Sequence, residues 1–126
     1  MRVCALTLAD ASSRADNPSR SETLTGFERA DALIVAGKVR VRPDKRALAL
    51  EAAERMASAT RQEAGCREYR VLTDVSEPNT LFVFEVWDSV DAMIRHFQTA
   101  HMAEFQEQLK KVAAAEPEVK RYLIAA

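Results

Sequence analysis

Glycine is scarce in this sequence: only Gly26, Gly37 and Gly65 occur among 126 residues, and they are scattered. They build neither a G-x-G-x-x-G fingerprint nor a P-loop, so no flavin, nicotinamide or nucleoside triphosphate motif is present. The two cysteines, Cys4 and Cys66, lie far apart and match no C-x-x-C or metal-ligand spacing. We therefore expect a reduced, cytoplasmic protein without a bound cofactor.

Charge and hydropathy exclude two further classes. The formal net charge is -1 and no basic cluster stands out, which argues against nucleic-acid binding. No apolar run approaches the roughly 20 residues that a membrane helix needs. The stretch at 3–9 contains Cys4 and Thr7 and is followed at once by Asp10, so it is weak as a signal peptide.

The chain has room for one domain, preceded by an extension. Residues 10–31 are polar, of mixed charge and without periodicity, so we interpret residues 1–31 as a flexible arm. The folded domain is expected to cover 32–126.

Alternating apolar residues predict the strands. Leu33, Val35, Val39 and Val41 alternate with basic residues before Pro43, which indicates a half-buried strand. Similar patterns predict strands at 66–75, 81–87 and 119–124. The first pair of these should form a hairpin across a Pro-Asn turn.

Apolar stripes at helical spacing predict the helices. A helix at 45–64 is expected to begin after an Asp44 cap, end before Gly65 and bury a stripe. A second helix is expected to begin at an Asp88 cap, with Asp91 in the capping-box position, and to reach a break near 98–100. A third follows at 101–115. The predicted buried residues of the three helices are Leu48, Ala52, Met56 and Ala59, then Val90, Met93, Ile94 and Phe97, then Met102, Phe105, Leu109 and Val112.

The resulting order, β-α-β-β-α-α-β, is the ferredoxin-like α+β pattern: a four-stranded antiparallel sheet with helices on one face. The opposite face would hold Ile34, Ala36, Phe82 and Phe84, which are too apolar to leave in water. A second subunit packed sheet to sheet would cover them, so a homodimer is expected.

The stretch at 64–105 resembles the antibiotic-biosynthesis-monooxygenase family, and the likeness extends over about 32–125. Its signature elements here are Gly65–Cys66, Glu85, Trp87, His96, His101 and Phe105. The resemblance implies a dimeric barrel of facing sheets. Several family members are cofactor-independent monooxygenases of quinols or polycyclic phenols, whereas others degrade haem or isomerise small metabolites, so the fold does not fix the reaction.

The two histidines are the main catalytic candidates. His96 lies at the edge of its helix's apolar face, where an imidazole can enter a cleft and act as a general base or simply pack. His101 begins the next helix, whose dipole disfavours the cationic form, and it either contacts substrate or caps the helix. The spacing of five separates them by about 140° on a continuous helix, and no third histidine is available, so we expect no metal site.

Three residues on the strands complete the predicted site. Glu85 and Trp87 share a strand face, so Trp87 either floors a cleft or is plain core. Glu85 is surrounded by apolar neighbours, so it should pair with an Arg or Lys across the sheet or meet a ligand or histidine. Tyr69 can supply a phenol to the same cleft or pack in the core.

The leading hypothesis is a cofactor-free monooxygenase of a quinol or aromatic phenol, because a deprotonated phenol can itself reduce dioxygen. His96 and Trp87 are its predicted catalytic residues, and Tyr69, Glu85, His101 and Phe105 its substrate-binding residues. A haem- or metabolite-binding protein and a dimeric interaction domain without catalysis are the alternatives. The asparagine of the haem-degrading branch aligns with Gly37, which counts against haem.

Overall fold

A computed structural model describes residues 32–124 of the chain. Within them the elements follow the predicted order, with a short 3-10 turn before the first helix. The strands are β1 (Leu33–Arg40), β2 (Cys66–Thr73), β3 (Thr80–Trp87) and β4 (Glu118–Leu123), and the helices are α3 (Arg46–Thr60), α4 (Val90–Phe97) and α5 (Ala100–Val112). The predicted arm at 1–31 lies outside the described residues.

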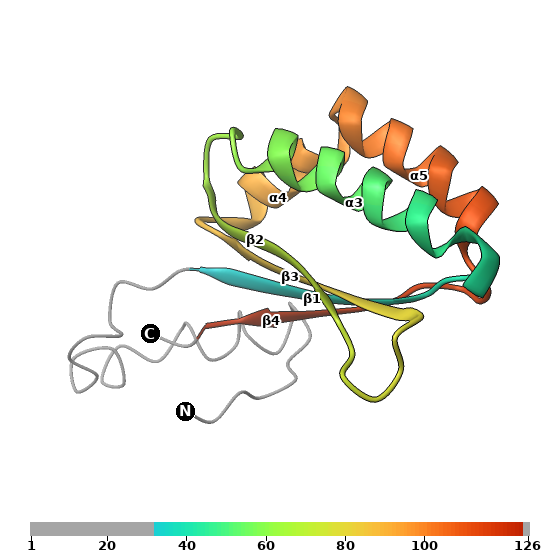
Figure 1. The fold of residues 1–126 in the computed structure, drawn as a ribbon. Coiled ribbons are helices and arrows are strands. Elements are labelled where there is room, and N and C mark those ends of the chain that lie inside the picture. The colour runs from blue at the N-terminus through green and yellow to red at the C-terminus, as the bar shows by residue number, and fades with distance from the viewer. Residues whose placement is uncertain (1–31, 125–126) are drawn as a thin grey trace.

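The four strands form one antiparallel sheet in the order β2-β3-β1-β4. The helices α3, α4 and α5 lie over one face of it (Figure 1). This is the predicted ferredoxin-like α+β fold. β4, which comes last in the chain, is an edge strand beside the central β1.

The strand register decides which side chains face the helices. Val35 of β1 is opposite Glu85 of β3 on one side and Arg121 of β4 on the other, and Tyr69 of β2 is also opposite Glu85. Side chains alternate between faces along a strand, so these paired residues project from one face. That face carries the helices, because all four residues line a cleft together with side chains from α4 and α5.

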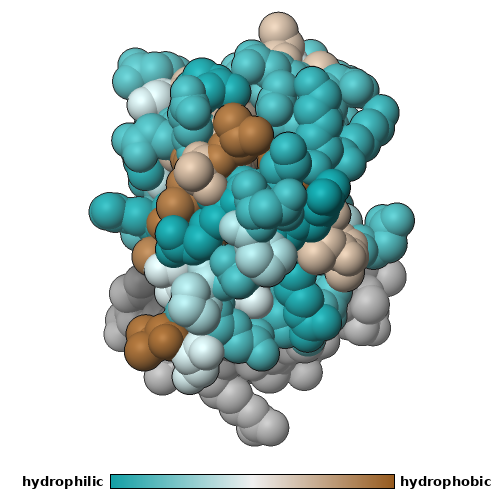
Figure 2. Space-filling view, turned by 45° about the vertical axis from the view of Figure 1, so that its right-hand side comes forward, coloured by the Kyte–Doolittle hydropathy of each residue, from teal (hydrophilic) through white to brown (hydrophobic). Residues whose placement is uncertain are grey.

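The opposite face carries the four apolar residues predicted for it. Ala36 pairs with Phe84, and Ile34 and Phe82 project from the same face by strand parity. On the side shown in Figure 2, hydrophilic residues dominate and hydrophobic ones reach the surface only in small patches. Within residues 32–124, no helix is both long and apolar enough to cross a bilayer.

Helix α3 packs against α5 and β2 through small side chains. Its buried residues include Ala49, Ala52 and Ala53, whereas Leu48, predicted to be buried, is 52% exposed. Alanines form this contact because their small side chains allow the backbone of α3 to approach its neighbours closely. The predicted Asp44 cap is also wrong: Asp44 lies in the 3-10 turn, and α3 begins without a side-chain cap.

The cap of α4 is Ser89 rather than the predicted Asp88. The Ser89 hydroxyl accepts a hydrogen bond from the Ala92 N–H at 3.1 Å. The Asp88 carboxylate instead accepts from the Arg67 guanidinium on β2. The Asp88 carboxylate is therefore part of a tertiary ion pair and does not cap the helix.

A tight turn brings the end of α3 against α4. The helix ends at Thr60 rather than at the predicted residue 64, and the chain turns through Gly65, whose φ is +87°. A Cβ atom at this position would lie 2.5 Å from the Cβ of Ala92. Both the positive φ and the close approach require glycine, so the segment just before Gly65 is held beside α4.

The predicted break between the last two helices is confirmed, and Thr99 organises it. Its hydroxyl accepts from the Met102 N–H at 3.2 Å and donates to the His96 carbonyl at 2.7 Å. One side chain thereby caps the start of α5 and satisfies a carbonyl at the end of α4. This break between α4 and α5 sets the directions in which the side chains before and after it point.

Candidate active-site cleft

A cleft of about 270 Å³ lies between the sheet and the helices α4 and α5. Most of its lining is apolar, and its polar side chains come from β2, β3, β4, α4 and α5. The lining residues used below are Tyr69, Glu85, His96, Met102, Phe105 and Arg121. Four predicted site residues therefore share one cleft: Tyr69, Glu85, His96 and Phe105.

His96 occupies the centre of the buried face of α4, not its predicted edge. Its side chain is 1% exposed, whereas Ile94, predicted to be buried, is 44% exposed. Tryptophan and tyrosine rings surround the imidazole: the ring centroids of Trp87 and Tyr69 lie 4.9 and 6.0 Å away. A polar ring at so buried a position needs a hydrogen-bond partner.

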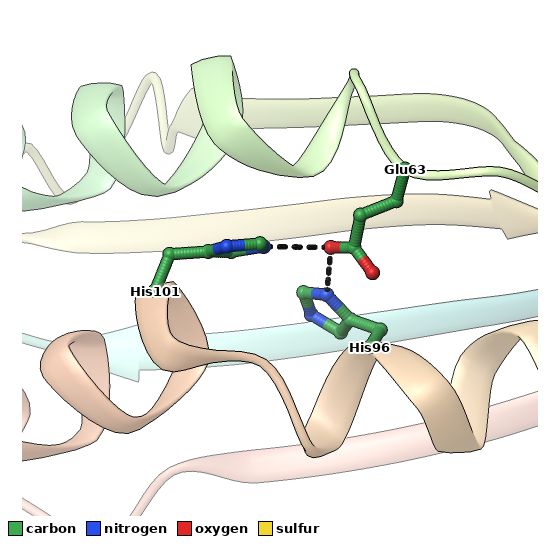
Figure 3. Close-up of side chains that lie close together, drawn as sticks. All are labelled: Glu63, His96 and His101. Atoms are coloured by element: carbon green, nitrogen blue, oxygen red, sulfur yellow. Dashed lines mark hydrogen bonds and ion pairs between the residues drawn. The ribbon is translucent and has the colours of Figure 1, made fainter.

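That partner is Glu63, which sequence reasoning missed. Its Oε2 lies 2.7 Å from His96 Nδ1 and also 2.7 Å from His101 Nε2 (Figure 3). The carboxylate comes from the turn after α3, and the imidazoles come from α4 and α5. The glycine two positions later was the available signal, since a turn forced against α4 carries its neighbours there.

Burial sets the charge state of His96. Removal from water lowers the pKa of the imidazole below its usual 6.5, and the hydrogen bond and negative charge of Glu63 oppose this shift. The net direction is downward, so His96 is mainly neutral at pH 7. A neutral imidazole holds one proton and one lone pair, as a general base requires.

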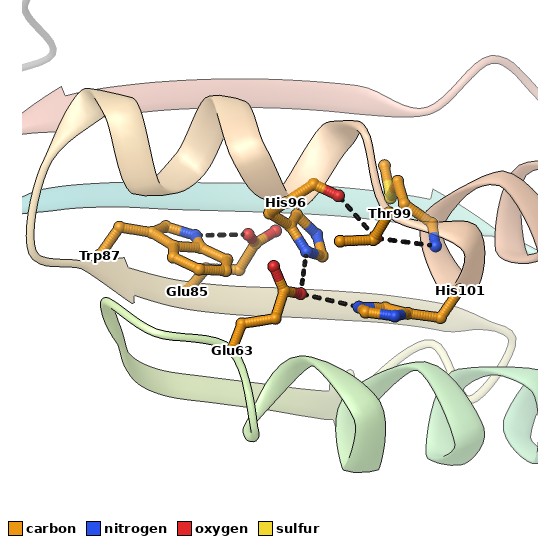
Figure 4. Close-up of polar contacts among 7 residues, drawn as sticks. Glu63, Glu85, Trp87, His96, Thr99 and His101 are labelled. Atoms are coloured by element: carbon orange, nitrogen blue, oxygen red, sulfur yellow. Dashed lines mark hydrogen bonds and ion pairs between the residues drawn. The ribbon is translucent and has the colours of Figure 1, made fainter.

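Glu85 carries the second carboxyl group of the site, and it is more deeply buried than Glu63. Its Oε1 accepts a hydrogen bond from Trp87 Nε1 at 2.8 Å (Figure 4). Burial raises the pKa of Glu85 to about 7, against the lowering effects of the Trp87 hydrogen bond and the Arg121 charge. Of the alternatives left open by the sequence, a direct ion pair to Arg or Lys is not formed within residues 32–124.

Trp87 lies behind the cleft rather than on its wall. Its side chain is fully buried, and it is not among the lining residues. It contacts the site through its bond to Glu85 and its ring beside His96. Of the two roles left open for Trp87, the structure therefore favours a core position, from which the indole contacts Glu85 and His96.

Tyr69 reaches His96 from the sheet, and His101 reaches it from α5. Tyr69 is 3% exposed, and burial followed by the charge of Glu85 raises the pKa of its phenol, which therefore stays protonated and able to donate. His101 has a 25% exposed side chain and lines a neighbouring cleft of about 140 Å³ between α3 and α5. Phe105 lines both clefts.

The cluster of Glu63, His96 and His101 also has the composition of a metal site. Its three donor atoms lie within 4.8 Å of one another. The carboxylate thus supplies the third ligand that the sequence prediction found missing. However, the two nitrogen–oxygen distances of 2.7 Å are those of hydrogen bonds, whereas neighbouring ligands of a tetrahedral ion bound at about 2.1 Å lie about 3.4 Å apart. In this structure, hydrogen bonds join the three side chains directly.

Fold and cleft together define a ferredoxin-like α+β domain with a histidine-carboxylate cluster beside an apolar cleft. The family model described as antibiotic biosynthesis monooxygenase matches residues 32–108. The chain belongs to this family.

Two curated relatives support the match. An uncharacterized protein of Synechocystis sp. is 35% identical over 109 residues, which cover 86% of this chain and 73% of that protein. A Bacillus subtilis protein named "Putative monooxygenase YcnE" is 30% identical over 89 residues, which cover 71% of this chain and 94% of that protein.

Solved structures share the fold. A conserved protein of Methanosarcina mazei Go1 has a TM-score of 0.73 at 25% identity, covering 77% of this chain and 96% of its own. A Deinococcus radiodurans protein titled "putative antibiotic biosynthesis monooxygenase" has a TM-score of 0.70 at 27% identity, covering 75% of this chain and 93% of its own.

Proposed function

We propose that this protein is a monooxygenase that oxidises a quinol or another aromatic phenol with O₂ and without a cofactor. The observation that carries the proposal is a buried, neutral imidazole on the wall of a largely apolar cleft of about 270 Å³. The family and the name of the Bacillus subtilis relative support the monooxygenase class. The cleft is open rather than filled by its aromatic side chains, which favours a ligand-binding role over a purely structural one.

The substrate itself can supply the electrons. His96 takes the proton from a phenolic O–H, and the resulting anion transfers electrons to O₂. One oxygen atom then forms a new bond to a ring carbon, and the other leaves as water. A quinol and O₂ contain the same atoms as the hydroxylated quinone and one water, so no external reductant is required.

Other side chains of the cleft would bind the aromatic ring and its anion. Phe105 and Met102 provide apolar walls for a flat ring. The Arg121 guanidinium attracts the negative charge that develops after deprotonation, and the Tyr69 hydroxyl can donate to it. Glu85 is best protonated during this step, because a second negative charge in the cleft would oppose the anion.

The sheet face away from the helices supports assembly. It carries an apolar set in which Ile34 is buried and the other three residues are half-buried: Ile34, Ala36, Phe82 and Phe84. A second copy packed against this face would remove its remaining apolar surface from water, so we propose that the protein acts as a homodimer. Sedimentation equilibrium measures this directly, and a monomeric mass at micromolar concentration would contradict it.

Oxygen uptake tests the proposed reaction. Chelator-treated protein, given a panel of quinols and naphthols and no added cofactor, is expected to consume O₂ and form the hydroxylated quinone. His96→Gln should lower kcat by at least about 100-fold, the usual contribution of a general base. Arg95→Gln is the matched control, because Arg95 lies next to His96 on α4 with an exposed side chain. An unchanged rate in His96→Gln would remove the catalytic assignment.

A further inference from the structure

We propose that Glu63 is a positioning residue that binds both histidines and fixes the proton of His96 on Nδ1, which leaves Nε2 as the basic atom. Its effect on catalysis rests on the proposed oxidation, whereas the fixed proton positions do not. This role does not follow from the family match, since it depends on which atoms meet at the carboxylate.

The two hydrogen bonds end on one oxygen atom. His96 Nδ1 and His101 Nε2 both lie 2.7 Å from Glu63 Oε2. An ionised carboxylate only accepts hydrogen bonds, so each of these ring nitrogens must carry the proton. A neutral imidazole has one N–H, and its other nitrogen is then a lone pair. The two rings therefore hold opposite tautomers.

This assignment gives His96 its basic atom. With the proton on Nδ1, the lone pair is on Nε2, and that nitrogen makes no hydrogen bond within the described part of the chain. The ring lines the main cleft, so Nε2 is the atom available to a phenolic O–H. Without the carboxylate, nothing would hold the ring in this tautomer, and the basic atom would be lost in a fraction of the molecules.

The proton taken up by His96 returns to oxygen. A cationic His96 keeps its Nδ1 proton on Glu63 Oε2 and carries the proton from the substrate on Nε2. The oxygen atom that leaves as water needs that proton, so Nε2 donates it back and the ring regains its neutral tautomer. Glu63 therefore keeps the same two hydrogen bonds throughout the reaction.

Two local features hold the cluster together. The turn at Gly65 fixes the segment that carries Glu63 against α4. The Thr99 hydroxyl ties the His96 carbonyl to the start of α5, which carries His101. The titratable and charged groups around His96 are Glu63 and His101 in the cluster and Tyr69, Glu85 and Arg121 in the cleft.

Nitrogen-15 NMR of labelled histidine tests the proton positions without any substrate. The chain contains two histidines, and a His101→Gln sample assigns their signals. The wild type at pH 7.5 is expected to show His96 protonated on Nδ1 and His101 on Nε2. Glu63→Ala should abolish the preference of His96. Glu104→Ala, which removes an exposed carboxylate of the second cleft, should leave it intact. A wild-type His96 protonated on Nε2, or an unchanged tautomer in Glu63→Ala, would overturn the proposal.

Kinetics test the positioning role. Glu63→Ala removes the acceptor of the His96 Nδ1 proton, so kcat for quinol oxidation should fall while KM changes little. Glu63→Gln is the conservative variant, because its amide oxygen can still accept from Nδ1, and it should retain more of the wild-type kcat. A normal kcat in Glu63→Ala refutes the effect on catalysis.

The two arms separate the possible failures. If the tautomers are as expected but the wild type consumes no O₂ with any quinol, the proposed oxidation is wrong and the positioning role of Glu63 stands. Titrating the labelled protein with Zn²⁺ adds a further check. Displacement of the ring protons at micromolar Zn²⁺ would show that the cluster is a metal site rather than a hydrogen-bonded positioning cluster.

Discussion

Replacing Glu85 with glutamine is expected to remove a pH-dependent loss of stability. Burial raises the pKa of Glu85 from 4.5 to about 7 in the folded protein, and the carboxyl group regains its ordinary value when the chain unfolds. Between these two pH values the folded protein holds a proton that the unfolded chain has released. The free energy of unfolding therefore falls as the pH rises through this window.

The size of the effect follows from the same shift. The interval from 4.5 to about 7 corresponds to about 3 kcal/mol at about 1.4 kcal/mol per pH unit. Glu85→Gln has no proton to lose, and its amide oxygen can still accept from Trp87 Nε1. Relative to the wild type, the variant should thus gain about 3 kcal/mol between pH 4.5 and pH 8.

Urea unfolding of both proteins at several pH values from 4.5 to 8.5 measures this difference. Protein concentration must be held constant, because dimerisation would add its own contribution to stability. Comparing the variant with the wild type cancels the titration of all other groups. If the difference in unfolding free energy between Glu85→Gln and the wild type does not change with pH in this range, Glu85 ionises normally. The conclusion that burial raises its pKa would then be wrong.

Three other perturbations test the structure. Gly65→Ala should destabilise the protein by about 3 kcal/mol in urea unfolding, because a positive φ costs about 1–2 kcal/mol and the contact with Ala92 adds overpacking strain. Thr99→Ala should cost about 1 kcal/mol in the same assay, through loss of the α5 cap. The fluorescence of Trp87, the single tryptophan, should change with a midpoint near pH 7 as the bonded Glu85 ionises.

Each of these has a control. Gly37→Ala should be tolerated, because its Cβ would lie 3.8 Å from the nearest atom, a Val83 carbon. Thr99→Ser keeps the capping hydroxyl and should retain most of the stability. Glu85→Gln should abolish the fluorescence transition near pH 7. Equal stability of the two glycine variants would contradict the role given to Gly65. Equal stability of the two Thr99 variants would contradict the capping role of its hydroxyl. A fluorescence transition that survives in Glu85→Gln would show that another group causes it.

The periodicity of the sequence was sufficient for the architecture but not for the ends of its helices. Alternation along β1 and helical spacing along α5 identified both elements and their buried faces. The predicted caps failed because a carboxylate has several available partners. Asp88 bonds to Arg67 on a neighbouring strand, and no local pattern reveals that strand's proximity. The predicted burial of Leu48 was wrong because alanines on α3 make the closer contact.

The candidate site could be predicted only in part from the sequence, for the same reason. Tyr69, Glu85 and His96 could be placed by strand parity and helical position. Glu63 could not, because it lies in a turn outside any periodic segment and reaches the histidines only after the chain folds. His96 was placed at an edge because a polar residue normally marks the boundary of an apolar face. Its bond to Glu63 makes full burial possible.

The short break between α4 and α5 limits how this part of the gene can vary in length. Each residue of an α-helix turns the chain by about 100°, so one codon inserted within α5 before His101 would rotate that imidazole away from the carboxylate. The β2–β3 connection at 74–79 is different, since most of its side chains are exposed and it lies outside both clefts. Peptide tags or reporter domains are therefore best grafted at that hairpin, where they leave the spacing of the two histidines untouched.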